Sequence, residues 1–183
     1  CRKLAPKARV LYTGTRSQYG PPQTSPVTEL HPLISTDVNG INKTAGEAYH
    51  LLYSRIYGLH TCSLRLSNTY GPRHQMRHHR QGVLNWFIRR VLDGNPITIF
   101  GDGTQIRDLH YVDDVVEAML LALASAKTHG QVYNLGGHPL SLKQVAALLI
   151  SLVPCGTLEY RPFPDDFKEV EIGDYIADYS KFK

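Results

Sequence analysis

Cysteine is scarce in this chain. The 183 residues contain three, at Cys1, Cys62 and Cys155, and this odd, scattered set defines neither a disulfide framework nor a metal-binding spacing. A reducing cytoplasm is therefore the expected compartment. Long apolar runs are also missing, because none approaches the roughly 20 residues that span a bilayer, and no signal-peptide pattern opens the chain. These absences argue against a disulfide-rich secreted protein and against a membrane partner.

A strong charge imbalance is lacking as well. The formal net charge is +4 and the isoelectric point is about 9.0. This balance suits an anionic small molecule but is too weak to indicate nucleic acid. Histidines and arginines gather in residues 73–80, yet no cysteine or carboxylate stands among them, so we expect no metal site there. A loop that closes over an anionic ligand and a solvated loop remain equally compatible with this cluster.

An initiating methionine is absent. The first residue is Cys1, and a strand-like run, Val10-Leu11-Tyr12-Thr13, follows almost at once. We therefore expect the chain to begin in mid-fold, with an upstream portion not included.

The chain does contain a regular alternation of strand and helix patterns. Apolar spacing predicts helices at about 42–57, 82–92, 113–126 and 142–153. β-Branched and alternating runs predict strands at 9–13, 61–67, 97–100, 107–112 and 131–135. A proline-rich loop, closed by Asn39-Gly40, separates the first strand from the first helix. Strands that alternate with helices indicate an α/β protein with a largely parallel sheet.

Polar residues follow two of the predicted strands where each strand ends. Thr13-Gly14-Thr15 ends the first, and the stretch Arg65–Arg73 ends the second and turns sharply at Gly71-Pro72. Open α/β sheets bind their ligands at the carboxyl ends of the strands. An amide at Asn68 can both donate and accept hydrogen bonds there, and Arg73 can fork onto an anionic oxygen.

Six stretches together carry a resemblance to a known family. They are TRSQYG at 15–20, KTAGE at 43–47, LRLSNTYGP at 64–72, PITIFGDGTQIRD at 96–108, YVDD at 111–114 and YNLGG at 133–137. In order and approximate spacing they resemble the carboxyl-terminal part of extended short-chain dehydrogenases/reductases. The nearest kind is the NAD-dependent sugar-nucleotide epimerase/dehydratase family, with UDP-glucose 4-epimerase-like proteins as cousins. The resemblance covers nearly the whole chain.

The resemblance implies an architecture and an activity. Residues 1–72 would be the carboxyl-terminal part of a doubly wound, Rossmann-like dinucleotide-binding domain. Residues 73–183 would be a smaller α/β substrate-binding region whose strands and helices return to the sheet. The implied reaction is transient hydride transfer on a sugar nucleotide with NAD, in a homo-oligomer. Relatives commonly dimerise through the helix that carries the lysine, so the apolar face of helix 42–57 could join a second copy or simply pack on the sheet.

The resemblance also implies roles for nine residues. The catalytic positions would be Thr15, Asn39 and Lys43; the cofactor would be held by Thr13, Lys43, Ser67 and Asn68; the substrate would be held by Asn68, Leu84, Phe100 and Arg107. Six of them have an ordinary structural alternative. Thr15 could only form a turn, Asn68 could cap a strand end, and Arg107 could pair with Asp108. Lys43 could be an exposed helix residue, and the two apolar residues could be plain core.

Two departures from the family pattern bear on activity. The Gly-x-x-Gly-x-x-Gly turn that cradles the dinucleotide pyrophosphate is absent from the chain. The family's acid/base pair is Tyr-x-x-x-Lys, and counting back from Lys43 gives Asn39, whose amide has no proton to exchange near neutral pH. Tyr12, Tyr19 and Tyr49 are near in sequence, but none has the required spacing.

The tail departs from the family as well. Residues 171–175 occupy the place of an arginine that usually reaches substrate phosphate, and Arg161 is the only arginine in that segment. Two hypotheses follow. The chain is part of an active NAD-dependent epimerase or dehydratase, or it is a truncated or degenerate relative that binds without turnover. NAD would bind only with an upstream nucleotide-binding half present.

Overall fold

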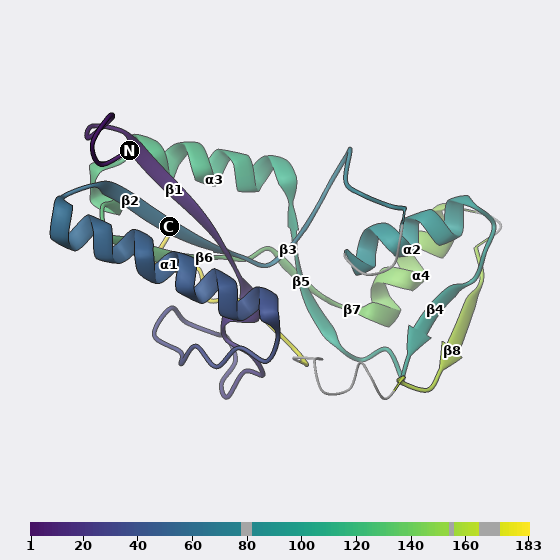
Figure 1. The fold of residues 1–183 in the computed structure, drawn as a ribbon. Helices are drawn as coiled ribbons and strands as arrows, with labels where there is room; N and C mark the ends of the chain where they lie inside the picture. Colours follow the sequence, from purple (N-terminus) through teal and green to yellow (C-terminus); the bar gives the residue numbers. More distant parts are fainter. Residues whose placement is uncertain (78–81, 154–155, 165–172) are drawn as a thin grey trace.

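Two lobes, joined by a small mixed sheet, make up the protein in the computed structural model (Figure 1). The structure describes residues 1–77, 82–153, 156–164 and 173–183. The joining sheet has the order β3–β5–β7, formed by Asn68–Tyr70, Ile106–Tyr111 and His138–Ser141. Because β3 pairs in parallel with β5 and β7 pairs antiparallel to it, the chain crosses between the lobes along hydrogen-bonded strands.

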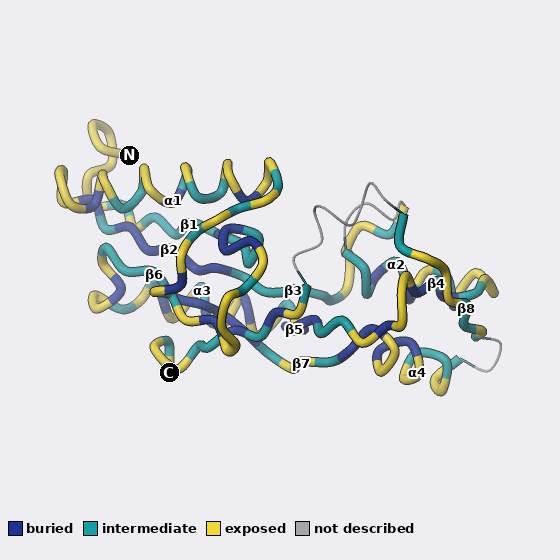
Figure 2. The backbone as a smooth tube through the Cα atoms, turned by 90° about the horizontal axis from the view of Figure 1, so that it is seen from below, coloured by how far each residue is buried: buried dark blue, intermediate teal, exposed yellow. Residues whose placement is uncertain are grey.

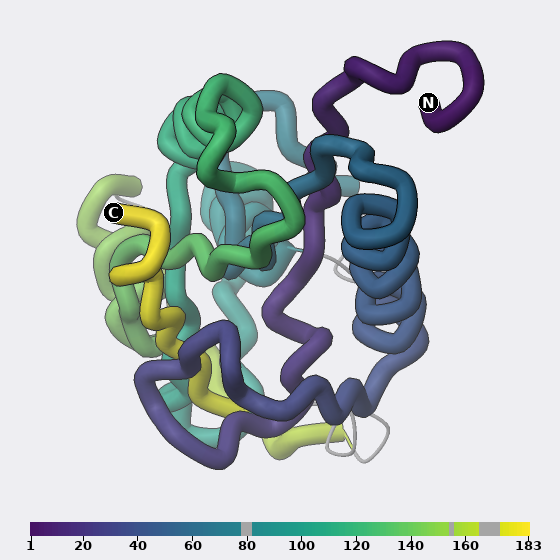
Figure 3. Tube along the Cα trace, turned by 90° about the vertical axis from the view of Figure 1, so that its left-hand side faces the viewer, coloured from purple at the N-terminus to yellow at the C-terminus, as the bar shows by residue number. Residues whose placement is uncertain are grey.

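The first lobe is a parallel three-stranded sheet between two helices (Figures 1 and 3). Its strands follow the order β1 (Arg9–Thr15), β2 (His60–Leu66) and β6 (Gln131–Leu135). Its helices are α1 (Val38–Tyr57) and α3 (Val112–Ala124). Short 3₁₀ turns, η1 and η2, cover Arg16–Gln18 and Ala126–Thr128. The register pairs Thr15 with Leu66 and Leu66 with Leu135, so the strands end at one common edge.

The two faces of β2 differ in chemistry. Side chains alternate across a strand, and Cys62 and Leu64 belong to the apolar cluster that includes Ala118 of α3. The intervening residues face α1, where Ser63 and Arg65 bind a helix carboxylate. Figure 2 shows the resulting buried band along β2 and β6. The α3 side is therefore closed by apolar packing, and the α1 side by directed polar contacts.

The second lobe has an apolar core. In it, β4 (Ile97–Phe100) pairs in parallel with β8 (Leu158–Arg161). The helices α2 (Val83–Leu92) and α4 (Leu142–Leu152) complete the lobe. Its buried cluster consists of Phe87, Val91, Ile97, Ile99, Leu109, Leu142, Val145 and Ala146. Ser141 caps α4 with its hydroxyl, and the Gln144 side chain reaches back to the Ser141 N–H, which completes a capping box.

The predicted α/β class and largely parallel sheet are confirmed, and the largest error in a predicted boundary is at the start of α1. Helix α1 begins at Val38, four residues before the predicted start, because the Asp37 carboxylate accepts a hydrogen bond from Gly40 N at 2.7 Å. Asn39-Gly40 is therefore the first turn of the helix rather than the end of a loop. Three short strands, β3, β7 and β8, were not predicted. The proposed boundary at residue 72 stays a prediction.

The apolar face of α1 points outward. Tyr49, Leu52 and Ile56 are 65%, 41% and 58% exposed, whereas the residues turned toward the sheet are Gly40, Glu47 and Ser54. The alternative that this apolar face packs on the sheet is therefore wrong. Among the described residues, no helix is both long and apolar enough to cross a membrane.

Candidate functional site

A cavity of about 690 Å³ begins at the end of β1 and extends into the second lobe. It is bounded by residues from α2, β3, β4, β5 and β8; those used below are Arg16, Asn68, Trp86, Arg90, Phe100, Arg107, Glu159 and Arg161. Three of the residues predicted to hold substrate, Asn68, Phe100 and Arg107, therefore share one cavity. Leu84 does not line it and packs instead against the apolar core of the second lobe.

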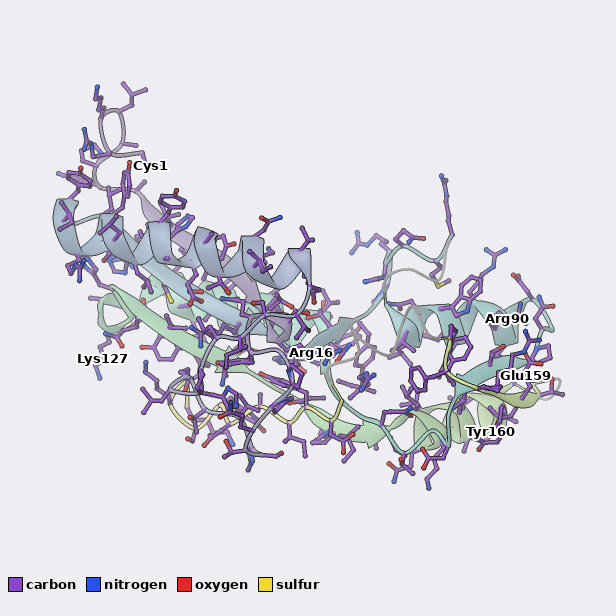
Figure 4. The ribbon with its side chains drawn as sticks, turned by 60° about the horizontal axis from the view of Figure 1, so that its bottom comes forward. Cys1, Arg16, Arg90, Lys127, Glu159 and Tyr160 are labelled. Atoms are coloured by element: carbon purple, nitrogen blue, oxygen red, sulfur yellow. The ribbon has the colours of Figure 1, made fainter. Side chains whose placement is uncertain are left out.

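The cavity wall is rich in guanidinium groups. Among the described residues that line it, Arg16, Arg90, Arg107 and Arg161 contribute four, against the one carboxylate of Glu159. Figure 4 shows Arg16 near the junction of the lobes, with Arg90 and Glu159 close together in the second lobe. A hydrogen bond from the Thr98 hydroxyl, with the nearby Arg161 guanidinium, lowers the pKa of Glu159. Such a wall suits an extended anion.

Arg107 is 5% exposed on β5. Its Nη1 donates to the carbonyls of Ile106 at 3.1 Å and Gly173 at 3.0 Å, which fixes the plane of the guanidinium. The neighbouring Asp108 carboxylate accepts instead from the backbone N–H of Gly137 at 2.7 Å and of Ala177 at 2.9 Å. Asp108 therefore ties β5 to the rest of the fold, and the simple Arg107–Asp108 pair is not what the structure forms.

Three consecutive polar side chains lie where β2 passes into β3. Ser67 Oγ, Asn68 Oδ1 and Thr69 Oγ1 are buried, and none has a hydrogen-bond partner among the described residues. A buried acceptor without a partner costs on the order of 1–3 kcal/mol, so such groups usually mark a place where a ligand or water binds. Two of the residues predicted to hold the cofactor, Ser67 and Asn68, belong to this group.

The amino end of α2 opens onto the same cavity. Its N-cap, Gly82, has φ of 77° and offers no side-chain hydrogen bond to the first turn, and both Gly82 and Val83 line the cavity. Asn85 is 3% exposed, and its Nδ2 has no hydrogen-bond partner among the described residues. Gly82 lies close to this amide, since a Cβ atom added to Gly82 would be only 3.2 Å from Asn85 Nδ2. The helix end therefore gathers N–H donors, which attracts an anion.

Lys43 and Thr13 meet at the end of β1. Lys43 Nζ donates to the Thr13 carbonyl at 2.7 Å, which brings the ammonium beside the strand end that also carries Thr15. The Thr15 side chain accepts from Ser17 N at 3.4 Å and caps η1. Thr15 therefore does take the turn-forming role, while its hydroxyl hydrogen remains able to donate. Asn39 lies one helical turn before Lys43 and is exposed.

The three nearby tyrosines occupy other roles. The Tyr12 hydroxyl donates to the Lys43 carbonyl at 3.1 Å, and burial, together with the Glu47 charge, raises the pKa of Tyr12. The buried Tyr19 hydroxyl donates to Asn134 Oδ1 at 2.6 Å, and burial raises its pKa. Tyr49 faces outward on α1. Both the Tyr12 and the Tyr19 hydroxyl thus donate to fixed acceptors within the fold, and neither residue lines the cavity.

A buried ion pair holds α1 on the sheet one turn after Lys43. Arg65 donates to Glu47 from Nη2 at 2.5 Å and from Nε at 3.1 Å, and Ser63 Oγ donates to the same carboxylate at 2.6 Å. The two charged side chains are only 5% and 3% exposed. Arg65 Nη1 also donates to the Tyr19 hydroxyl at 2.7 Å, so the loop after η1 joins the network.

Sequence reasoning missed Asn85, Trp86 and Arg16 as residues at or near the cavity. The sequence signal for Asn85 was its position in the first turn of a helix whose N-cap is glycine. Glutamate or glutamine is common there as part of a capping box, whereas Asn85 follows a glycine that offers no side chain to cap the helix. Arg161 was noted only as the last arginine of its segment; it lines the cavity and pairs with Glu159 at 3.1 Å. The predicted basic loop 73–80 and the stretch 171–175 lie partly outside the described residues.

The family is shown by sequence. The sequence model of the NAD dependent epimerase/dehydratase family matches residues 1–136, and the chain belongs to this family. A UDP-glucose 4-epimerase of Mycolicibacterium smegmatis is 37% identical over 135 residues, which cover 73% of this chain and 42% of that protein. The chain thus spans less than half the length of this curated relative.

Solved structures show the same fold. The UDP-glucose 4-epimerase of Thermus thermophilus, solved as a complex with NAD, superposes with a TM-score of 0.85 at 30% identity and covers 100% of this chain and 58% of that one. A UDP-glucuronic acid 4-epimerase of Bacillus cereus, solved with UDP-glucuronic acid and NAD, gives a TM-score of 0.81 at 29% identity, with 94% and 53% covered. The Rossmann-like resemblance is therefore confirmed.

Proposed function

We propose that this chain forms the substrate-binding part of an NAD-dependent sugar-nucleotide epimerase or dehydratase that acts by transient hydride transfer. The observation that carries the proposal is the cavity, which is lined by Asn68 and Phe100 and by the four guanidinium groups described above, that of Arg107 included. A nucleoside diphosphate brings two negative charges along an extended molecule, which matches that wall. Family membership and the UDP-sugar names of its relatives point the same way.

The substrate would lie along the cavity. Its diphosphate would sit between Arg107, Asn68 and the amino end of α2, where donors converge. Its base would reach Phe100, whose ring lies 6.0 Å from that of Phe163, and its sugar would point toward Thr15. Leu84, which packs against the apolar cluster and does not line the cavity, would contribute to the base subsite only from behind its wall.

The residues present fit one end of NAD. Lys43, fixed on the Thr13 carbonyl, would hold the nicotinamide ribose, and the buried unpartnered atoms of Ser67 and Asn68 would accept the hydrogen bonds of the nicotinamide end. NAD, when bound, supplies a hydride acceptor that returns the hydride. Since the glycine-rich pyrophosphate turn is not in this sequence, we expect calorimetry to find no micromolar NAD binding to this chain alone.

Proton transfer is the step in which this chain departs from its family. The Thr15 hydroxyl can hold the reacting sugar hydroxyl, and the Lys43 ammonium can stabilise the oxygen as its proton leaves. The Asn39 amide can orient that hydroxyl but cannot take its proton. Asn39 is the specific observation that favours the second function, a relative that binds sugar nucleotides without turnover.

The single tryptophan allows a direct test. Trp86 is the one tryptophan in the sequence and it lines the cavity. We expect UDP-glucose and UDP to quench its fluorescence with micromolar dissociation constants, and uridine to bind at least about tenfold more weakly because it lacks the diphosphate. No quenching and no calorimetric heat with any nucleotide would contradict both functions. Nucleotide binding with no sugar conversion after NAD and a family dinucleotide-binding half are added would favour the second function.

We also propose a homo-oligomer, formed through the outward face of α1. Tyr49, Leu52 and Ile56 expose an apolar stripe on a helix whose other side is satisfied by the sheet. Exposed apolar stripes of this length usually mark an interface. Light scattering should show a dimer or larger, and Ile56→Glu should shift it toward monomer. The free thiols of Cys1 and Cys62 are compatible with the proposed cytoplasmic location.

A further inference from the structure

Tyr12 belongs to β1, the strand that runs beside α1 (Figure 1), and its side chain contacts that helix at Lys43 and Gly46. Its hydroxyl donates to the Lys43 carbonyl at 3.1 Å, so it holds the helix backbone at the lysine itself. Its ring centre is 5.3 Å from Lys43 Nζ, within the range in which an ammonium is attracted to an aromatic face. One residue thus contacts both the main chain and the charged end of Lys43.

Gly46 leaves the space that this ring fills. A Cβ at Gly46 would lie 2.3 Å from the Tyr12 hydroxyl oxygen and 2.7 Å from the carbon that bears it. Atoms cannot approach so closely, so any larger residue would push the ring away. On the other side, the ring centre of His50 lies 4.7 Å from that of Tyr12, and His50 Nδ1 is 2.7 Å from the Gly46 carbonyl. The ring is therefore held between Lys43 and His50.

Two further observations connect this packing to the strand end. Lys43 Nζ donates to the carbonyl of Thr13, the residue that follows Tyr12 on β1. The pKa of Tyr12 is raised by burial and by the charge of Glu47, so the phenol keeps its proton and acts as a donor. The ring, the lysine and the strand carbonyl form one closed set of contacts that does not depend on any bound molecule.

We propose that Tyr12 is a positioning residue that, with the notch at Gly46, fixes the Lys43 ammonium at the end of β1. It acts through Lys43 and touches neither substrate nor cofactor. The inference rests on the proposed function only in that Lys43 would hold the nicotinamide ribose; the position of the ammonium is testable without NAD.

The first test measures the reactivity of Lys43. Acetylation with a small acylating reagent requires the amine to leave its hydrogen bond to Thr13, and mass spectrometry reports each lysine separately. We expect Tyr12→Leu to raise the Lys43 rate about two- to fivefold relative to the exposed Lys127, because the ring contact is lost. Tyr12→Phe keeps the ring and should stay within about twofold of wild type. Equal Lys43 rates in folded wild type and Tyr12→Leu would overturn the proposal.

The second test uses the notch and compares the effect of Gly46→Ala in two backgrounds, wild type and Tyr12→Leu. Gly46→Ala should lower the melting temperature and raise the Lys43 rate in wild type, since its methyl group displaces the ring. In a Tyr12→Leu background the same change should raise the melting temperature, because alanine is the better helix former once the clash is gone. The same sign in both backgrounds would refute the notch.

Nucleotide quenching of Trp86 separates this inference from the proposed function. UDP binding should be the same in wild type and Tyr12→Leu, because Tyr12 does not line the cavity. If wild type fails to bind UDP while the acetylation pattern holds, the proposed function fails and the positioning role stands. If UDP binds and the acetylation pattern does not hold, only the positioning role fails.

Discussion

The layer beneath α1 in the first lobe and the core of the second lobe differ in the kind of side chain that they bury. Beneath α1 the first lobe buries charge, with Glu47 bound by Arg65 and Ser63 and the network extended to Tyr19. The core cluster of the second lobe is made only of apolar side chains such as Ile97 and Phe87. Apolar packing tolerates small changes of shape, whereas a buried ion pair tolerates almost no change of chemistry.

This difference assigns the polar groups of the two lobes to different tasks. In the first lobe, the polar groups fix the position of α1 along the sheet and its rotation about its own axis. This also fixes Lys43, because Lys43 lies one helical turn from Glu47. In the second lobe, Asn85 is buried in the first turn of α2, and Arg107 of the joining sheet lines the cavity; neither belongs to the apolar cluster. Removing a polar group should therefore cost stability in the first lobe and ligand affinity in the second.

The largest effect should come from Glu47→Gln. The substitution keeps the shape of the side chain but leaves the buried Arg65 guanidinium without its counter-charge, which costs about 3–5 kcal/mol. Urea unfolding followed by circular dichroism would measure it. Glu117→Gln, an exposed change of the same kind on α3, should stay within about 0.5 kcal/mol. Comparable losses in the two variants would show that the network contributes nothing special.

Next comes Arg107→Ala, which should act on affinity. Loss of a guanidinium contact to phosphate, typically about 1.5–3 kcal/mol, predicts UDP-sugar binding weaker by roughly ten- to a hundredfold. Thr15→Val is the matched comparison, because Thr15 would touch only the sugar; its binding should be nearly unchanged. Trp86 quenching gives both dissociation constants. An equal loss of affinity in both variants, or no loss in Arg107→Ala, would show that the diphosphate does not bind at Arg107.

A sharper test of the second lobe is Asn85→Asp. Asn85 is 3% exposed, so a carboxylate there loses solvation that the helix dipole, worth about 0.3–1 kcal/mol, offsets only in part, and the melting temperature should fall. The same charge would repel a diphosphate, so UDP binding should weaken by about tenfold or more. Asn95→Asp makes the same charge change at an exposed position after α2. Unchanged UDP affinity in Asn85→Asp would remove the helix end from the binding site.

The smallest effect should be that of Ile97→Val. Ile97 is fully buried in the apolar cluster, and loss of one methylene costs about 0.5–1.5 kcal/mol. Unfolding in urea, with the exposed Ile34→Val as reference, would measure it. A loss as large as that of Glu47→Gln would erase the contrast between the two interiors.

Periodicity predicted the order of the main helices and strands but not the inward side of α1. An amphipathic pattern places Tyr49 and Ile56 inside and Glu47 outside, and the structure does the reverse. The information lies in Arg65, a residue 18 positions away on another element, which no local pattern contains. Strand β8 was missed for a similar reason, since its four residues take their conformation from pairing with β4.

The candidate site was predictable only in part. The expected positions of Lys43, Asn68 and Arg107 came from resemblance to a family, and strand-end chemistry supported Asn68 independently. Leu84 stays a prediction: it packs, partly buried, against the apolar cluster of the second lobe and is not among the residues that line the cavity. Trp86 and Asn85 were missed because a helix pattern gives one face to the core and does not say which residue meets a neighbouring cavity.

The joint between the lobes is built from strands. β3 and β5 pair over Asn68–Tyr70, and β5 and β7 pair from Ile106 to Leu109, so the lobes are connected by hydrogen-bonded ladders. Proteins that close around ligands usually turn about a few loop residues. Here, any rotation of one lobe against the other must bend a sheet. Arrival of a nucleotide should therefore be a single-step process, with a rate that rises in proportion to concentration and without a slower second phase.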